Sequence, residues 1–188
     1  DELAQNFSID GISKSPAVFD YDKLKWFNAE YIRSMEPEKF LSLAMPYFRE
    51  VFGEKECDWQ VLASILQPRV IQMTQIPEMI SFFRELPDYP VDFFVNKKSK
   101  TNLENSGTML EAAIAELEQI NDWKLDVLHE ALISLAGRLG VKNGTLLWPV
   151  RIAAAGVQVT PGGAMEILTI LGKDEALCRL RIGLEKLK

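Results

Sequence analysis

The residues best suited to contact a ligand gather in one stretch of the chain, "KNGTLLWPVRIAAAGVQVTPGGAMEIL", residues 142–168. Arg151 stands alone among apolar residues, and its planar guanidinium group supplies several hydrogen-bond donors. The residue types alone fit a surface arginine equally well. Further along, Thr160 and Pro161 have the pattern of a helix start, with threonine as the cap and proline at the first position. Backbone N–H groups at such a start lack internal partners and can bind oxygen atoms of a ligand.

Two glycines follow that predicted helix start. Gly162 and Gly163 have no side chain, so a flat ligand could approach the backbone closely. A glycine inside a helix is unfavourable by roughly 1 kcal/mol, so two in a first turn indicate a close approach of some kind. Tight packing between helices would also require glycine. The sequence leaves both explanations open.

No other residues predict catalysis or metal binding. His129 is the only histidine, and its place beside an apolar stripe is typical of a packed structural residue. Cys57 and Cys178 lack metal-type spacing and are expected to be reduced thiols of a cytoplasmic protein. There is no glycine-rich phosphate loop. "GISKSP", residues 11–16, is predicted to be a surface turn. We therefore expect no catalytic residue, metal or cofactor in this chain.

Composition and charge allow a packed protein with an uneven surface. Hydrophobic residues make up 47% of the 188 residues, and no apolar run is long enough to cross a bilayer. Residues 137–188 contain eight basic and four acidic residues, a net charge of +4; because the whole chain carries −6, the first 136 residues carry −10. Such a basic end can steer a polyanion to one face, although a solvated surface with a random charge bias explains the same numbers and is favoured by charge alone. The acidic, polar start without an initiator Met suggests a piece of a longer chain.

Helical periodicity dominates the sequence and predicts an all-α fold. The predicted helices cover residues 21–35, 37–52, 57–67, 77–86, 108–120, 123–139, 142–156, 160–172 and 174–188. Pro46 should kink or split the second of them. Asp20, Asp122 and the Thr108–Glu111 capping box are expected at helix starts, and Gly140 is expected at a left-handed helix end.

The domain organisation is expected to be two consecutive helical subdomains, residues 1–95 and 96–188. The boundary falls in the polar segment Val95–Gly107, which predicts either a linker or a surface loop.

Three motifs at the two ends of the chain resemble one known family. They are "SKSPAVFDYDKLKWFNAEYIR", "KNGTLLWPVRIAAAG" and "TPGGAMEILTILGKDEALCRL". In this order they are similar to the anticodon-binding C-terminal part of bacterial-type glutamyl-tRNA synthetases. The resemblance covers essentially the whole chain and is weak only between residues 90 and 125.

The resemblance implies that this chain binds tRNA and that a catalytic domain lies outside it. The helical part of this family holds the anticodon arm of tRNA(Glu), while an N-terminal catalytic domain in cis uses ATP and Mg²⁺ to ligate glutamate. This segment alone would then have no catalytic site. A monomeric, cytoplasmic protein without a membrane partner is expected.

The resemblance also assigns roles to single residues. Arg151, in "WPVR", matches an arginine that contacts anticodon bases, and Thr160 matches a position that touches the anticodon. Pro161 and Gly162 would shape the pocket. Gly163 stands where the family often has a bulkier apolar residue, which puts stacking by a side chain in doubt.

A second arginine and a competing function complete the expectations. Arg69, in "LQPRV", aligns with the arginine that selects the third anticodon base of glutamate tRNA over that of glutamine tRNA. The alternative to RNA recognition is a helical interaction module that docks a protein through the Trp148 region and no longer binds RNA.

Overall fold

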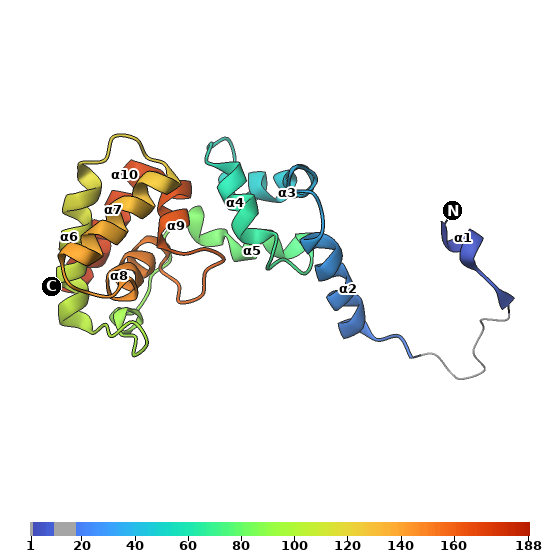
Figure 1. Ribbon diagram of the computed structural model, residues 1–188, viewed down its shortest axis with the longest axis horizontal. Coiled ribbons are helices and arrows are strands. Elements are labelled where there is room, and N and C mark those ends of the chain that lie inside the picture. The colour runs from blue at the N-terminus through green and yellow to red at the C-terminus, as the bar shows by residue number, and fades with distance from the viewer. Residues whose placement is uncertain (1, 10–17) are drawn as a thin grey trace.

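A computed structural model describes residues 2–9 and 18–188 of the chain (Figure 1). The α-helices are α1 Glu2–Asn6, α2 Tyr21–Arg33, α3 Pro37–Phe52, α4 Trp59–Leu66, α5 Ile76–Met79, α6 Leu103–Glu118, α7 Leu125–Arg138, α8 Asn143–Ala155, α9 Ala164–Leu171 and α10 Lys173–Lys186. Short 3-10 helices cover Met73–Gln75, Ser81–Phe83 and Val91–Phe94. The described residues contain no strand beyond one isolated bridge between Asn96 and Thr101. The prediction of an all-α fold is confirmed.

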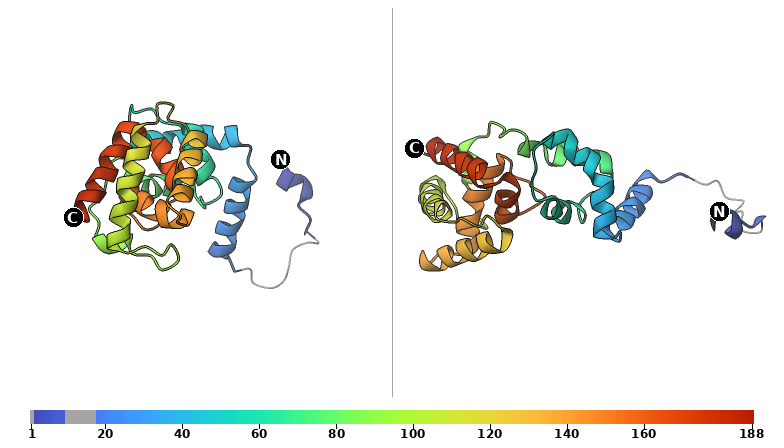
Figure 2. Two further views of the ribbon diagram at one scale, coloured as in Figure 1. Left: turned by 60° about the vertical axis from the view of Figure 1, so that its left-hand side comes forward. Right: turned by 90° about the horizontal axis from the view of Figure 1, so that it is seen from above.

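The helices form two neighbouring groups. Helices α6 to α10 make a bundle in which α8 contacts α6, α7, α9 and α10. Helices α3 to α5 form the second group, and α4 packs on α9 of the bundle. Helix α2 projects from the second group, away from the bundle (Figures 1 and 2). One cluster of buried side chains runs through both groups, from Ile32 on α2 to Leu180 on α10.

Arg179 joins the bundle to the segment that leads into it. Its side chain is only 1% exposed. Its guanidinium group donates to the carbonyl oxygens of Phe82 at 2.7 Å, Ala154 at 3.1 Å and Phe83 at 3.3 Å, and to the Glu175 carboxylate at 2.6 Å. Buried carbonyl groups need such partners because leaving them unpaired is costly. Arg179 therefore ties α10 to α8 and to the 3-10 helix at residues 81–83.

Several predicted helix boundaries are confirmed where one residue type decides them. The Asp20 carboxylate accepts hydrogen bonds from the backbone N–H groups of Asp22 and Lys23, both at 3.0 Å. Gly140 and Gly156 have left-handed backbones, with φ of 67° and 66°. Each ends a helix in the conformation that glycine adopts most readily.

Other boundaries differ from prediction because a different cap is used. Helix α6 begins before Thr108, since Asn102 and Asn105 form a capping box through reciprocal side-chain hydrogen bonds. Asp122 does not cap α7; its carboxylate pairs with Lys124 at 2.8 Å. Helix α3 continues through Pro46, so the predicted split does not occur.

The predicted linker is ordered and packed. Residues 96–101 form a tight turn, and α6 begins within the segment at Leu103. The backbone oxygen of Ser99 accepts a hydrogen bond from the Thr145 hydroxyl at 2.7 Å, which fixes the turn to α8. The segment is thus a surface turn followed by a helix. The division into residues 1–95 and 96–188 stays a prediction.

The crossing of α8 and α10 predicts a large effect for one small substitution. A Cβ atom on Gly183 would lie 2.6 Å from Cβ of Ala153 and 3.2 Å from the Tyr89 hydroxyl. We expect Gly183→Ala to lower the free energy of unfolding by about 1–2 kcal/mol, because overpacking outweighs the higher helix propensity of alanine. Urea denaturation measures this change.

Gly137→Ala is the matched control, since no atom lies within 4 Å of its added Cβ. It should leave stability unchanged or raise it by up to about 1 kcal/mol. A Gly183→Ala protein as stable as its parent would contradict the close packing of α8 and α10.

Candidate functional site

Residues from distant parts of the sequence meet where α4 packs on α9. Arg69 follows the C-terminal end of α4, and its Nη1 donates to the backbone oxygen of Ile65 at 2.8 Å. On the other side, a Cβ atom at Gly162 would lie 3.0 Å from Cδ1 of Ile65. Ile65 therefore lies between Arg69 and the loop of residues 156–163, which joins α8 to α9. The predicted site residues of "LQPRV" and "TPGG" belong to one junction.

Arg151 holds that loop from α8. Its Nη1 donates to the Thr160 hydroxyl at 2.7 Å and its Nη2 to the backbone oxygen of Gln158 at 3.0 Å. The guanidinium group lies over the Trp148 ring, 4.6 Å from the ring centroid. Burial lowers the pKa of Arg151 from its ordinary value. An arginine nevertheless stays cationic at neutral pH. The positive charge of Arg151 is therefore held against the loop.

Thr160 connects the loop internally and does not cap a helix. Its hydroxyl donates to the backbone oxygen of Gly162 at 2.7 Å while it accepts from Arg151. Helix α9 begins only at Ala164, with Gly163 at the cap position and no capping side chain. The predicted helix start at residues 160–161 is therefore wrong. The hydroxyl that would cap the helix is already used within the loop.

The two glycines of the loop have different surroundings. Gly162 is where the loop packs closely on Ile65, so the packing explanation applies to it. Gly163 is exposed, and the Glu166 carboxylate lies 2.9 Å from the place where its Cβ would be. Pro161, which precedes the two glycines in the chain, is buried. A ligand that approaches this loop meets the Gly163 backbone and the Glu166 carboxylate.

Arg69 is the most accessible cation of the junction. Its side chain is exposed, and within the described part of the chain only Nη1 has a hydrogen-bond partner. The remaining donors of its guanidinium group face no internal acceptor there. Arg69 and Arg151 thus differ. Most donors of Arg69 are free to bind a ligand, whereas the guanidinium group of Arg151 is held by the loop and by Trp148.

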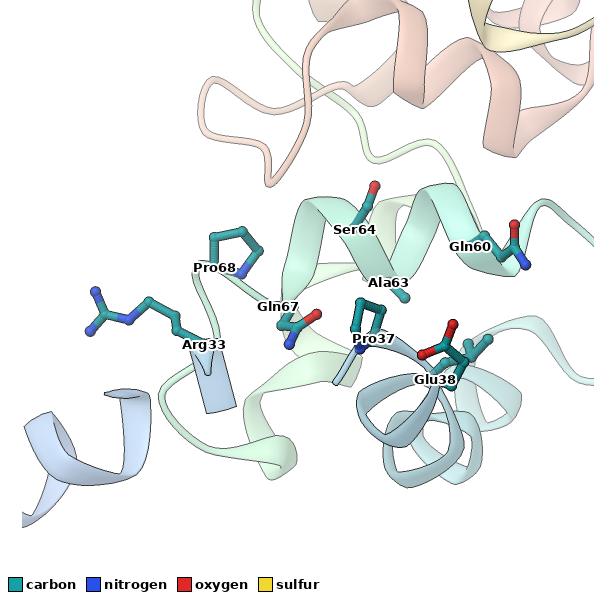
Figure 3. Close-up of a pocket in the computed structure, with 9 residues that line it drawn as sticks. Arg33, Pro37, Glu38, Gln60, Ala63, Ser64, Gln67 and Pro68 are labelled. Atoms are coloured by element: carbon teal, nitrogen blue, oxygen red, sulfur yellow. The ribbon is translucent and has the colours of Figure 1, made fainter. Parts of the chain in front are cut away.

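A pocket of about 610 Å³ opens between the end of α2, the start of α3 and α4, and Pro68, the residue before Arg69, is part of its lining (Figure 3). Its lining includes Ser64, Gln67 and Pro68 of α4 and the following turn. The Gln67 amide nitrogen donates to the backbone oxygens of Ile32 and Met35, so its amide oxygen is the group left to accept. Sequence reasoning missed this pocket, because it is assembled from ordinary residues of three elements.

Ion pairs in space cancel much of the charge asymmetry seen in the sequence. Cations of the basic end pair with acids of the preceding region. These pairs are Arg138–Glu116 at 2.5 Å, Arg181–Glu118 at 2.7 Å and Lys186–Asp88 at 2.6 Å. Subtracting them from the +4 of residues 137–188 leaves +1. These pairs favour a solvated surface over a basic face at this end, so single arginines are the relevant charges.

The remaining candidate residues do not join the junction. His129 is exposed on α7, so the prediction of a packed histidine is wrong. Among the described residues no group of His, Cys, Asp and Glu could hold a metal ion. Burial raises the pKa of Cys57 to about 12, while Cys178 is exposed. The "GISKSP" motif lies outside the described residues.

Trp148 offers little surface to a protein partner. It is half-buried, its indole nitrogen donates to the backbone oxygen of Phe93 at 2.9 Å, and Arg151 lies over its ring. These contacts make Trp148 a platform for Arg151. They do not favour the alternative of a docking module centred on this residue.

Comparisons with a family model and with known proteins agree with one another. The anticodon binding domain model matches residues 39–184. Glutamate–tRNA ligases of Clostridium tetani and Clostridium novyi are 46% and 44% identical over the whole chain, which spans 38% and 39% of their lengths. The match lies in the C-terminal part of these relatives.

Solved structures share the fold. A crystal structure of a glutamate tRNA ligase from Elizabethkingia meningosepticum, 21% identical, matches the whole chain with a TM-score of 0.82 over 36% of its own length. The enzyme from Elizabethkingia anophelis, 23% identical, matches 98% of the chain with a TM-score of 0.76 over 35% of its length. None of the helices in the described residues is long and apolar enough to cross a membrane. The chain belongs to the anticodon binding domain family.

Proposed function

We propose that this chain recognises the anticodon arm of glutamate tRNA as the non-catalytic part of a glutamate–tRNA ligase. The observation that carries the proposal is the contact series from Arg151 through Thr160, Gly162 and Ile65 to Arg69. It brings two arginines of different helical groups to one junction. The family match and the full-length similarity to glutamate–tRNA ligases support the same function.

The chemistry of the junction suits unpaired nucleobases. Proteins read single-stranded loops by stacking on bases and by hydrogen bonds to their exposed edges. Arg69 has free donors for a base edge or a phosphate oxygen. Arg151 is already oriented by Trp148 and Thr160, so little conformational entropy is lost when RNA binds. Thr160 and the exposed Gly163 backbone would contribute to the binding surface of the junction, with Pro161 and Gly162 shaping the loop beneath it.

Arg69 would supply discrimination between tRNAs. In this proposal its guanidinium group contacts the third anticodon base and favours glutamate tRNA over glutamine tRNA. The exposure of the group and its single internal hydrogen bond support this role. A planar fork of donors recognises the acceptor pattern of one base better than that of another.

The ligation reaction would take place elsewhere in the longer protein. We assign glutamate, ATP and Mg²⁺ to an N-terminal catalytic part in cis, and this chain alone should not aminoacylate tRNA. The protein would act as a cytoplasmic monomer. The role of this chain is then to hold the anticodon arm while the acceptor end reaches the catalytic part.

Calorimetry with short RNA hairpins tests the proposal. The chain should bind a hairpin with the anticodon-arm sequence of glutamate tRNA about tenfold or more tighter than one with the same stem and a scrambled loop. Affinity should fall by about tenfold or more between roughly 50 and 200 mM salt, because binding releases counterions. Equal affinity for both hairpins, or no salt dependence, would refute RNA recognition by this chain.

A further inference from the structure

The α2 arm, residues 18–33, exposes a concentration of large apolar side chains. They are Val18, Phe19, Tyr21, Leu24, Trp26, Phe27 and Tyr31, each between 44% and 89% exposed. Some of these rings touch one another: Phe19 lies against Tyr21 with ring centroids 4.9 Å apart, and Trp26 against Phe27 at 5.1 Å. Tyr21, Leu24, Phe27 and Tyr31 recur at helical spacing on one face of α2, and such an apolar face is normally covered by another part of a protein.

Among the described residues, those outside the α2 arm anchor its C-terminal end. Within α2 the buried residues are Ala29 and Ile32. The Gln67 amide nitrogen donates to the backbone oxygen of Ile32 at 3.0 Å, and the Asn28 amide donates to that of Ile71. The remainder of the helix extends away from α3 to α5 (Figures 1 and 2). A 13-residue helix is marginal without packing, so its apolar face requires a partner.

The charges of the α2 arm favour a protein partner over RNA. Three acidic and three basic residues give the arm a net charge of zero. Lys25 pairs with Asp22 at 3.6 Å and Arg33 with Glu30 at 2.7 Å, so two of the three cations are already paired. A phosphate backbone is attracted by unpaired positive charge. The arm offers apolar area with a neutral rim, which suits an apolar protein surface.

We propose that the apolar face of the α2 arm docks on the polypeptide that precedes this region in the longer protein. The inference rests on the proposed function, in which the chain is the C-terminal part of a ligase. The curated relatives match only over 38–39% of their lengths, in their C-terminal part. The arm lies at the N-terminal side of the matched helices, where preceding chain would enter. Because that partner is covalently connected, its effective concentration is high.

Docking of the arm would orient the two halves of the protein. Gln67 holds the end of α2 and stands two residues before Arg69. A partner that fixes α2 therefore also fixes the direction in which the Arg69 side of the junction faces. The arm would set the distance between the anticodon site and the site of ligation.

Hydroxyl-radical footprinting read by mass spectrometry tests the docking. We compare the 188-residue chain with the longer protein expressed together with its own upstream coding sequence. Labelling of Phe27 and Tyr31 should fall at least about tenfold in the longer protein, because the two side chains are 44% and 72% exposed here and become covered. Val159, 88% exposed in the loop near α9, is the matched control and should be labelled equally in both proteins.

A substitution in the arm provides a second measurement. Phe27→Asp should leave the 188-residue chain folded, since the ring is 44% exposed there. In the longer protein it should restore labelling of Tyr31 to the level of the short chain. Equal labelling of Tyr31 in the two unsubstituted proteins overturns the proposal. So does protection that appears only in a dimer, as judged by light scattering, because the occupant is then a second copy.

The hairpin-binding test uses the short chain and does not involve the arm. Protection of the arm without RNA binding would refute the proposed function alone. RNA binding without protection would refute the docking alone.

Discussion

Replacing Arg179 with methionine should lower the free energy of unfolding by about 3–5 kcal/mol. Methionine approaches the length of the arginine side chain but donates no hydrogen bond. The carbonyl groups of Phe82, Phe83 and Ala154 would lose their buried donor, and each unsatisfied carbonyl is unfavourable by about 1–3 kcal/mol. Urea denaturation followed by circular dichroism measures the change.

Arg181→Met is the matched control on the same helix. Arg181 is exposed and pairs with Glu118 on the surface, an interaction worth about 0–1 kcal/mol. Its loss should therefore change stability little. If both substitutions were equally mild, Arg179 would not be the link between α10, α8 and residues 82–83. The size of the difference between the two variants measures that link directly.

The sequence predicted best those features that a single residue decides locally. Asp20 caps α2, and Pro37 occupies the first turn of α3. Gly140 and Gly156 adopt the left-handed backbone expected after a helix. In each case the residue has a strong conformational preference and no competitor within a few positions. Helix existence was predictable for the same reason, since the apolar period repeats over several turns.

Prediction failed where two side chains compete for one role. Thr108 and Asn102 both precede an apolar period, and the reciprocal bonds of Asn102 with Asn105 select the earlier start. Thr160 has the right type to cap a helix, but Arg151 reaches its hydroxyl from α8. Only the folded chain brings that guanidinium group close, so no local pattern could exclude the cap.

The candidate site was predictable by residue type and not by contact. The motifs identified Arg69, Arg151 and Thr160, yet nothing in the sequence places Ile65 between the two halves of the junction. Arg179 could be counted only as one of several basic residues near the C-terminus. Its burial depends on carbonyl groups from residues almost one hundred positions away.

Replacing Arg151 with alanine should weaken binding of the glutamate anticodon hairpin by about 1–3 kcal/mol, a loss of roughly 5- to 150-fold in affinity. Two effects contribute. A base contact of the guanidinium group is lost, and the loop loses the hydrogen bonds to Thr160 and Gln158 that hold it. The contacts with Trp148 and the loop predict a loss of about 1–2 kcal/mol in folding as well.

Two further variants separate recognition from loop positioning. Thr160→Val removes the hydroxyl that Arg151 holds but keeps the guanidinium group, so it reports on loop positioning together with any contact that the hydroxyl itself makes. Arg181→Ala removes a cation on α10 that pairs with Glu118, so it reports on general charge. If Arg151 contacts a base, its replacement must lose more affinity than either control, and the loss must shrink when the contacted base is changed. Equal losses for all hairpins would exclude a base contact of Arg151. The same titrations at two salt concentrations distinguish a base contact from a phosphate contact, since only the latter lowers the salt slope by about one.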